Sequence, residues 1–178
     1  MNYQEILDFW FIEVSHEERF SKSVHLDMEM KKRFGELLMK AKRGELYNWR
    51  KDPSGRLAEI LILDQFSRNI FRGKPESFET DPMALTLAQE MVMMKLDGEF
   101  IPERRAFIYM PYMHSESRVI HEEAVKLFSA VGLEEHLGYE MLHKEIIDQF
   151  GRYPHRNGIL GRVSTPEEIE FSKTNSGF

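Results

Sequence analysis

The stretch LAEILILDQFSRNIFR, residues 57–72, decides how we expect this chain to fold. Apolar residues occupy every side of a helix drawn through it, and a helix that is apolar all round is buried. We therefore predict a central helix over about residues 53–72. The apolar residues that share a side with its charged end are Leu57, Ile60 and Leu61. Asp64, Arg68 and Arg72 would emerge from a buried surface, where a charge needs a partner.

Helical periodicity also dominates the rest of the chain, and no segment shows the sustained alternation of a strand. We predict an all-α fold of about eight helices. Short loops between them favour antiparallel helix pairs, in an irregular bundle or a superhelix. Besides the central helix, we expect helices over about residues 3–14, 23–43, 116–131 and 134–150. Three further helices should begin at about residues 81, 102 and 165.

Several helix ends can be assigned from capping residues. Asp81 before Pro82 reads as an N-cap, and Ser115 reads as another, with Glu116 in the first turn. Pro111 should kink or stop its helix. The sequence TPEE at 165–168 is a capping box that begins the last helix. We expect residues 173–178 to be a frayed tail.

Composition limits the possible functions. The 178 residues fit one domain, 1–178, and the absence of cysteine excludes disulfides and cysteine-ligated metal sites. The N-terminus lacks the pattern of a signal peptide and no apolar run could span a bilayer, so we expect a soluble cytoplasmic protein. A net charge of −6 argues against general nucleic-acid binding. We expect no membrane partner and no cofactor, and the oligomeric state stays open.

Local charge differs from this average. The phrase Asp-Gln-Phe-x-Arg occurs at 64–68 and again at 148–152, and each copy leads into an arginine-rich stretch without carboxylates, residues 65–75 and 149–166. Glycines near the second copy would let backbone N–H groups approach an anion. We predict that the two stretches form unlike walls of one site, with 114–116 as a third. The candidate ligand-binding residues are Asp64, Gln65, Arg68, Asn69, Arg72, His114, Glu116, Arg152, His155, Arg156, Asn157 and Arg162.

Each candidate also has an ordinary structural explanation. Asp64 and Arg68 are four residues apart and could form an ion pair that only fixes helix register. The arginines of the second stretch could cap helix carbonyls, an explanation that suits Arg152 better than Arg156. Capping explains Glu116 but leaves His114 unexplained. A metal site on His114, Glu116 and His121 has no standard ligand spacing, so we predict no metal.

Five segments together resemble an uncharacterised bacterial family, domain of unknown function 924: LILDQFSRNIFR (61–72), MPYMHSE (110–116), FGRYPHRN (150–157), LGR (160–162) and STPEE (164–168). The resemblance extends over residues 10–171. Ser67 and Tyr153 stand where the family pattern leads us to expect Pro and Phe. The resemblance implies an all-helical fold similar to tetratricopeptide-repeat proteins, and it implies no activity, substrate or catalytic residue.

Three functions follow from these residues. The first is a binding module that captures the phosphate or carboxylate of a small molecule or an acidic peptide in a pocket lined by Arg, Asn and His. The second is an enzyme acting on an anionic substrate, with His114 or His155 as general acid–base and Glu116 or Asp64 orienting it. The third is a structural protein in which the motifs form one closed polar network. The first is our preferred interpretation.

Overall fold

The computed structural model describes residues 2–175, and within that range it contains helices and no strand. The all-α prediction is confirmed. The α-helical segments are α1 Tyr3–Asp8, α2 His16–Arg19, α3 Val24–Lys42, α4 Pro53–Leu61, α5 Ser67–Ile70, α6 Asp81–Met93, α7 Pro102–Met113, α8 Arg118–Phe128, α9 Glu134–Phe150 and α10 Pro166–Thr174. Short 3₁₀ turns lie between several of them, among them Pro75–Ser77 before α6 and Pro154–Arg156 after α9.

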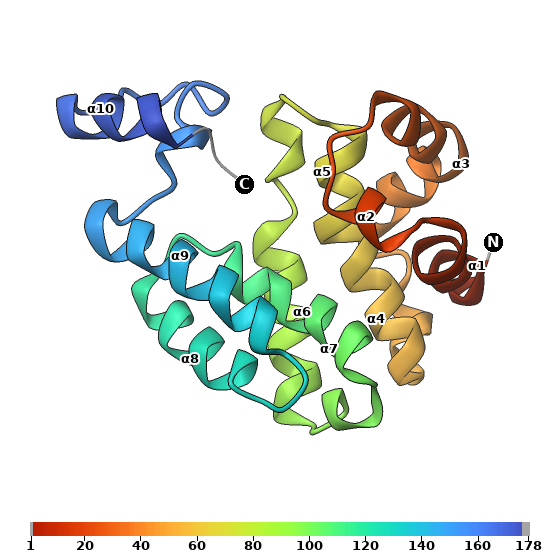
Figure 1. Ribbon diagram of the computed structural model, residues 1–178. Helices are drawn as coiled ribbons and strands as arrows, with labels where there is room; N and C mark the ends of the chain where they lie inside the picture. The colour runs from red at the N-terminus through yellow and green to blue at the C-terminus, as the bar shows by residue number, and fades with distance from the viewer. Residues whose placement is uncertain (1, 176–178) are drawn as a thin grey trace.

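Helix α4 lies in the middle of the packing. It contacts α1 on one side and α6 and α7 on the other, while α3 packs against α5. Helices α6, α7, α8 and α9 then pack in sequence, each on the one before (Figure 1). Helix α10 lies at the far end of the molecule from α1 and contacts the turn after α9. Consecutive helices are therefore mostly spatial neighbours, as short connections require.

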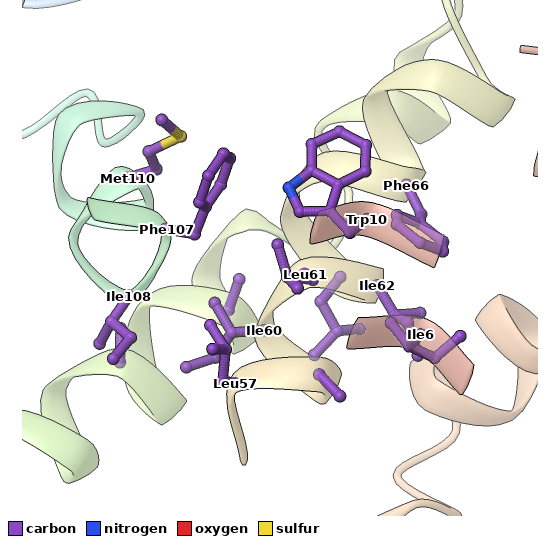
Figure 2. Packing of buried hydrophobic residues seen from close by; sticks show 14 of the residues in the cluster. Ile6, Trp10, Leu57, Ile60, Leu61, Ile62, Phe66, Phe107, Ile108 and Met110 are labelled. Atoms are coloured by element: carbon purple, nitrogen blue, oxygen red, sulfur yellow. The ribbon is translucent and has the colours of Figure 1, made fainter. Parts of the chain in front are cut away.

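The core lies between α1, α4 and α7. Trp10 packs on Phe66 and on Phe107, with ring centroids 5.6 and 5.7 Å apart. Figure 2 shows these rings above the aliphatic side chains of α4, including Leu57 and Ile60. All of these side chains are at most 2% exposed. The prediction that residues 57–72 form the buried centre is confirmed for their apolar residues up to Ile70, whereas Phe71 is partly buried.

The central helix is not regular. Residues Ile62–Phe66 form a π-helical turn between α4 and α5, and a second π-helical turn, Phe9–Glu13, continues α1. A π turn adds a residue to the helical repeat, so the side chains after it rotate relative to an ideal helix. Such turns are rare in proteins, and those that occur are often found at functional sites. The first copy of the Asp-Gln-Phe-x-Arg phrase begins inside one.

Some helix ends differ from the sequence prediction. Thr80 is the N-cap residue of α6, and Asp81 lies at the first helical position. Asp81 was predicted as a cap, but its carboxylate pairs with arginine instead. Ser115 is not a cap either, because α8 begins after Ser117. Pro111 is tolerated inside α7, which ends two residues later.

Other predicted ends are confirmed. Thr165 caps α10 in a capping box with Glu168, and Gly44, after α3, has a φ of +73°, which glycine adopts without strain. Of the tail predicted to fray, Lys173 and Thr174 are helical, and residues 176–178 lie outside the described part of the chain. Among the described helices, none has the length and apolar character needed to cross a membrane.

Candidate functional site

A pocket of about 550 Å³ opens where α6 begins, α7 ends and the segment after α9 returns. Its apolar lining comes from Pro75, Phe78, Pro82, Leu85, Pro111 and Leu160. Its polar lining comes from Glu76, Glu79, Asp81, His114, Ser115, Glu116 and Arg156. The pocket therefore brings together parts of all three segments that the sequence singled out. An apolar cavity with a few convergent polar groups is the usual form of a small-molecule site.

The ring of His114 is held by Asp64. His114 is the C-cap residue of α7, and its Nδ1 lies 2.7 Å from Asp64 Oδ1. Asp64 is 1% exposed and also accepts a hydrogen bond from Gln65 Nε2 at 2.7 Å. Burial alone would raise the pKa of Asp64, but Arg68 and His114 lower it below its ordinary value. The carboxylate is thus ionised, and Nδ1 of His114 must carry the proton that joins them.

Arg68 connects this pair to the start of α6. One guanidinium nitrogen lies 2.9 Å from Asp64 Oδ1, which confirms the predicted pair four residues apart. The same guanidinium makes two hydrogen bonds to Asp81, at 2.8 and 2.9 Å. Because Arg68 serves two carboxylates, its charge is fully compensated by the protein. Arg68 therefore supports the pocket from behind and offers no free charge to a ligand.

Arg156 is placed differently. Its side chain is 7% exposed, and Nη1 lies 3.5 Å from the carboxylate oxygen Oδ2 of Asp81. One good hydrogen bond runs from Nη2 to the carbonyl of His114, at 3.0 Å, and Nε is buried with no partner among the described residues. The guanidinium also lies over the rings of Phe78 and Tyr153, 4.6 and 4.5 Å from their centroids. Burial, and then repulsion from Arg68, lower the pKa of Arg156.

Glu116 is fully engaged by the C-terminal segment. Its two carboxylate oxygens accept hydrogen bonds from Arg162 at 2.7 and 2.9 Å. One of them also accepts the backbone N–H of Tyr153 at 2.7 Å. Burial would raise the pKa of Glu116, but Arg162 and the Tyr153 N–H lower it. Glu116 is therefore an ionised anchor for the segment and has little capacity left for a ligand.

The end of α7 is fastened by side chains from other elements. The carbonyls of Met113, His114 and Ser115 accept hydrogen bonds from Tyr153 Oη at 2.5 Å, Arg156 Nη2 at 3.0 Å and His121 Nε2 at 2.9 Å. The last carbonyls of a helix have no partner within it, so these donors replace the missing turn. Capping is thus a role of Arg156, whereas Arg152 donates to the carbonyl of Val163, which lies outside the helices. The expectation that capping suits Arg152 better than Arg156 is therefore wrong.

His121 reaches Ser115 because a buried carboxylate holds its other nitrogen. Its Nδ1 lies 2.7 Å from Glu140 Oε1, and both side chains are 0% exposed. Burial raises the pKa of Glu140. These two residues come from α8 and α9 and lie behind the loop that carries His114. They fix the loop and leave the ring of His114 to be oriented by Asp64.

Of the predicted site residues, three line the pocket and three stand directly behind it. The three lining residues are His114, Glu116 and Arg156. The three behind it orient the ring of His114: Asp64 contacts the ring, and Gln65 and Arg68 hold Asp64. Arg162 acts through Glu116. Convergence of the three segments is therefore found, but through Arg156 and not through the second Asp-Gln-Phe-x-Arg phrase itself.

The remaining candidates lie elsewhere. Asn69 and Arg72 both bind Asp27 of α3, and Arg152 and Asn157 both bind Glu168 of α10. His155 is absent from the pocket lining and packs against the ring of Tyr153, 5.4 Å between centroids. Burial, with Arg156 nearby, lowers the pKa of His155 to about 4. The expectation of two uncompensated cationic stretches is wrong, because carboxylates from distant segments neutralise most of them.

Ten of the thirteen lining residues were not predicted as site residues, and two of these ten, Asp81 and Phe78, contact Arg156. Asp81 was assigned to helix capping from the Asp-Pro pair, and that assignment concealed its pairing with Arg68 and its place in the pocket. Phe78 stacks on Arg156, and no motif marked it. Within residues 2–175 no group of three His, Cys, Asp or Glu is arranged to hold a metal ion.

Comparison with known proteins places this geometry in a family. The model of a family described as "Bacterial protein of unknown function (DUF924)" matches residues 6–176, so the chain belongs to that family. A solved structure titled as the protein of unknown function ATU0120 from Agrobacterium tumefaciens is similar, with 35% identity and a TM-score of 0.92. The alignment covers 97% of each chain. No curated protein gives a match.

Proposed function

We propose that this member of the DUF924 family is a binding protein that holds a small molecule by its phosphate or carboxylate group at Arg156. One observation carries the proposal. Arg156 lies buried at the wall of the pocket, and its carboxylate contact is a long one, 3.5 Å to an oxygen of Asp81 that Arg68 binds at 2.9 Å. A buried charge is costly unless it is paired, and a ligand anion would supply the partner.

The contrast with the neighbouring arginines supports this assignment. Arg68 and Arg162 each form two hydrogen bonds to one carboxylate, all between 2.7 and 2.9 Å. Arg156 has one hydrogen bond to a carbonyl and a contact of 3.5 Å to a carboxylate that Arg68 already occupies. Its guanidinium is the natural place for an added anion, because a planar fork matches phosphate and carboxylate.

The rest of the lining defines the ligand further. Phe78, Leu85, Pro111 and Leu160 present apolar surface beside Arg156. A ligand that joins an apolar body to an anionic end would fit both parts, and the end of an acidic peptide offers the same chemistry. Charge attraction at long range does not draw an anion in, because Asp64, Asp81 and Glu116 balance Arg68, Arg156 and Arg162, and the lining also carries Glu76 and Glu79. The proposal therefore rests on the short-range fork of Arg156.

A closed polar network without a ligand fits the observations less well. Such a network would satisfy every buried donor and leave no cavity beside it. Instead the pocket of about 550 Å³ adjoins the guanidinium of Arg156, whose contact to a carboxylate is 3.5 Å long. The network around Asp64 and Glu116 is complete, which confines the open position to Arg156.

Thermal unfolding with matched ligand pairs tests the proposal. The probes are 3-phenylpropionate with its uncharged amide, and phenyl phosphate with phenol. At a concentration of 100 times Kd, a true ligand should raise the melting temperature by about 5–10 °C. We expect at least one anion to stabilise the wild type and its uncharged counterpart not to.

Two variants provide the control. Arg156→Gln removes the charge at the pocket, whereas Arg72→Gln removes an arginine that pairs with Asp27 outside it. The anion should still stabilise Arg72→Gln and should lose its effect on a folded Arg156→Gln. Equal stabilisation of the charged and uncharged probes, or no shift with any anion, contradicts the proposal.

A further inference from the structure

The orientation of His114 is more specific than ligand binding requires. Asp64 is held by three groups at once: the ring of His114 at 2.7 Å, the amide of Gln65 at 2.7 Å and Arg68 at 2.9 Å. It lies in the π-helical turn Ile62–Phe66, and His114 follows a helix that contains Pro111. The π-helical turn and the C-terminal end of α7 bring the two residues into contact, with His114 at the wall of the pocket and Asp64 behind it.

This contact fixes which ring nitrogen of His114 is free. Burial, and then Arg68, lower the pKa of His114, so the ring is neutral near pH 7. Its single proton lies on Nδ1, where ionised Asp64 accepts it. No described residue makes a hydrogen bond to Nε2, and His114 lines the pocket. Nε2 therefore offers a lone pair, as the base of a histidine–carboxylate pair does.

The pocket offers few protons for such a base to take. Among its lining residues the side chain of Ser115 carries the single hydroxyl. Ser115 is adjacent to His114 in the chain, and its carbonyl is fixed by His121. Water entering the pocket is the remaining source of an O–H proton. Activated water adds to electrophilic carbon, so hydrolysis is the reaction that this pair would support with water as its proton source.

We propose that Asp64 and His114 form the general-base pair of a hydrolase that cleaves an ester bond in a substrate held by its anionic group at Arg156. The proposal rests on the anion-binding function above. His114 is the catalytic residue and Asp64 a positioning residue. The alternative bases are less suitable, because Arg162 and the Tyr153 N–H occupy Glu116, and His155 is absent from the pocket lining.

The reaction balances with water alone. Nε2 of His114 removes a proton from water while the water oxygen forms a bond to the ester carbonyl carbon. Asp64 stabilises the imidazolium that results. The imidazolium then returns its proton to the leaving alkoxide oxygen as the carbon–oxygen bond breaks. The products are a carboxylic acid and an alcohol, and the pair is restored to its starting state.

Hydrolysis of two chromogenic esters tests the proposal: 4-nitrophenyl hemiglutarate, which carries a carboxylate, and 4-nitrophenyl acetate, which does not. The wild type should hydrolyse the hemiglutarate with saturation and should prefer it in kcat/KM. His114→Gln should lower kcat by about 10²-fold or more, the usual contribution of a general base. Arg156→Gln should mainly raise KM. His25→Gln changes an exposed histidine and should have no effect.

Further readouts separate the possible failures. Asp64→Asn should lower kcat with little change in KM, and a histidine ¹⁵N spectrum should show that the proton has left Nδ1 of His114. If the wild type hydrolyses the hemiglutarate no faster than His114→Gln does, the catalytic proposal is wrong. If glutarate, 3-phenylpropionate or phenyl phosphate still raises the melting temperature, anion binding stands without catalysis. If none of these anions raises it, both proposals fail. If Ser115→Ala loses as much activity as His114→Gln, the proton that His114 removes does not come from water, and that part of the proposal is wrong.

Discussion

The two copies of Asp-Gln-Phe-x-Arg are identical in four of five letters and have different roles. Asp64 is 1% exposed and pairs with Arg68, whereas the side chain of Asp148 is 47% exposed and pairs with Lys144. Arg152 turns to Glu168 of α10 instead of Asp148. The first copy begins in a π turn at the centre of the fold and continues into α5, and the second ends α9 at its rim. Position in the fold, and not local sequence, sets the role of these charges.

Replacing the two phenylalanines should show the largest difference. Phe66 is 0% exposed and packs on three other rings, while Phe150 is half-buried and packs mainly on Phe171. Phe66→Ala should cost about 3–5 kcal/mol in the free energy of unfolding. Phe150→Ala should cost about 1 kcal/mol, because less apolar surface is removed. Urea unfolding at pH 7 measures both, and equal costs would remove the distinction between the copies.

Replacing the two aspartates should show the next largest difference. Asp64→Asn leaves Arg68 and His114 without the buried carboxylate, and breaking a buried pair costs about 3 kcal/mol or more. Asp148→Asn removes an exposed pair worth about 0–1 kcal/mol. The same urea titrations provide the comparison. If Asp148→Asn proves as costly as Asp64→Asn, the exposure of Asp148 in the fold is wrong.

A smaller effect should appear in acid, through the ion pair of the second copy. Hydrogen bonds from Arg152 lower the pKa of Glu168 to about 2, against an ordinary value of 4.5. A carboxyl with a lowered pKa stabilises the folded state above about pH 4.5, and this stabilisation is lost as pH falls through about 2. In Arg152→Gln the free energy of unfolding should therefore depend less on pH between about pH 4.5 and pH 2. Unchanged pH dependence would show that the pair does not act on Glu168.

The sequence predicts the helices and the central position of Phe66 because both depend on the local pattern of apolar residues. It also indicates His114 and Arg156, since no capping or core role accounted fully for them. Asp27 and Glu168 could not be predicted as partners, because they meet Arg72 and Arg152 only after the fold has brought distant segments together. The π turn at Asp64 is equally invisible in apolar periodicity, and it sets the direction of that carboxylate.

The central claim is that Asp64 holds His114 as a neutral ring with an unprotonated Nε2 at the pocket. A two-dimensional ¹H–¹⁵N spectrum of the histidine side chains, assigned with His114→Gln and recorded near pH 7, tests it directly. The account predicts that Nδ1 of His114 carries the proton and that Nε2 does not. It also predicts that the ring is still neutral at pH 6.5, the ordinary pKa of histidine, because the pKa of His114 is lowered. A proton on Nε2, or a charged ring at pH 7, would contradict it.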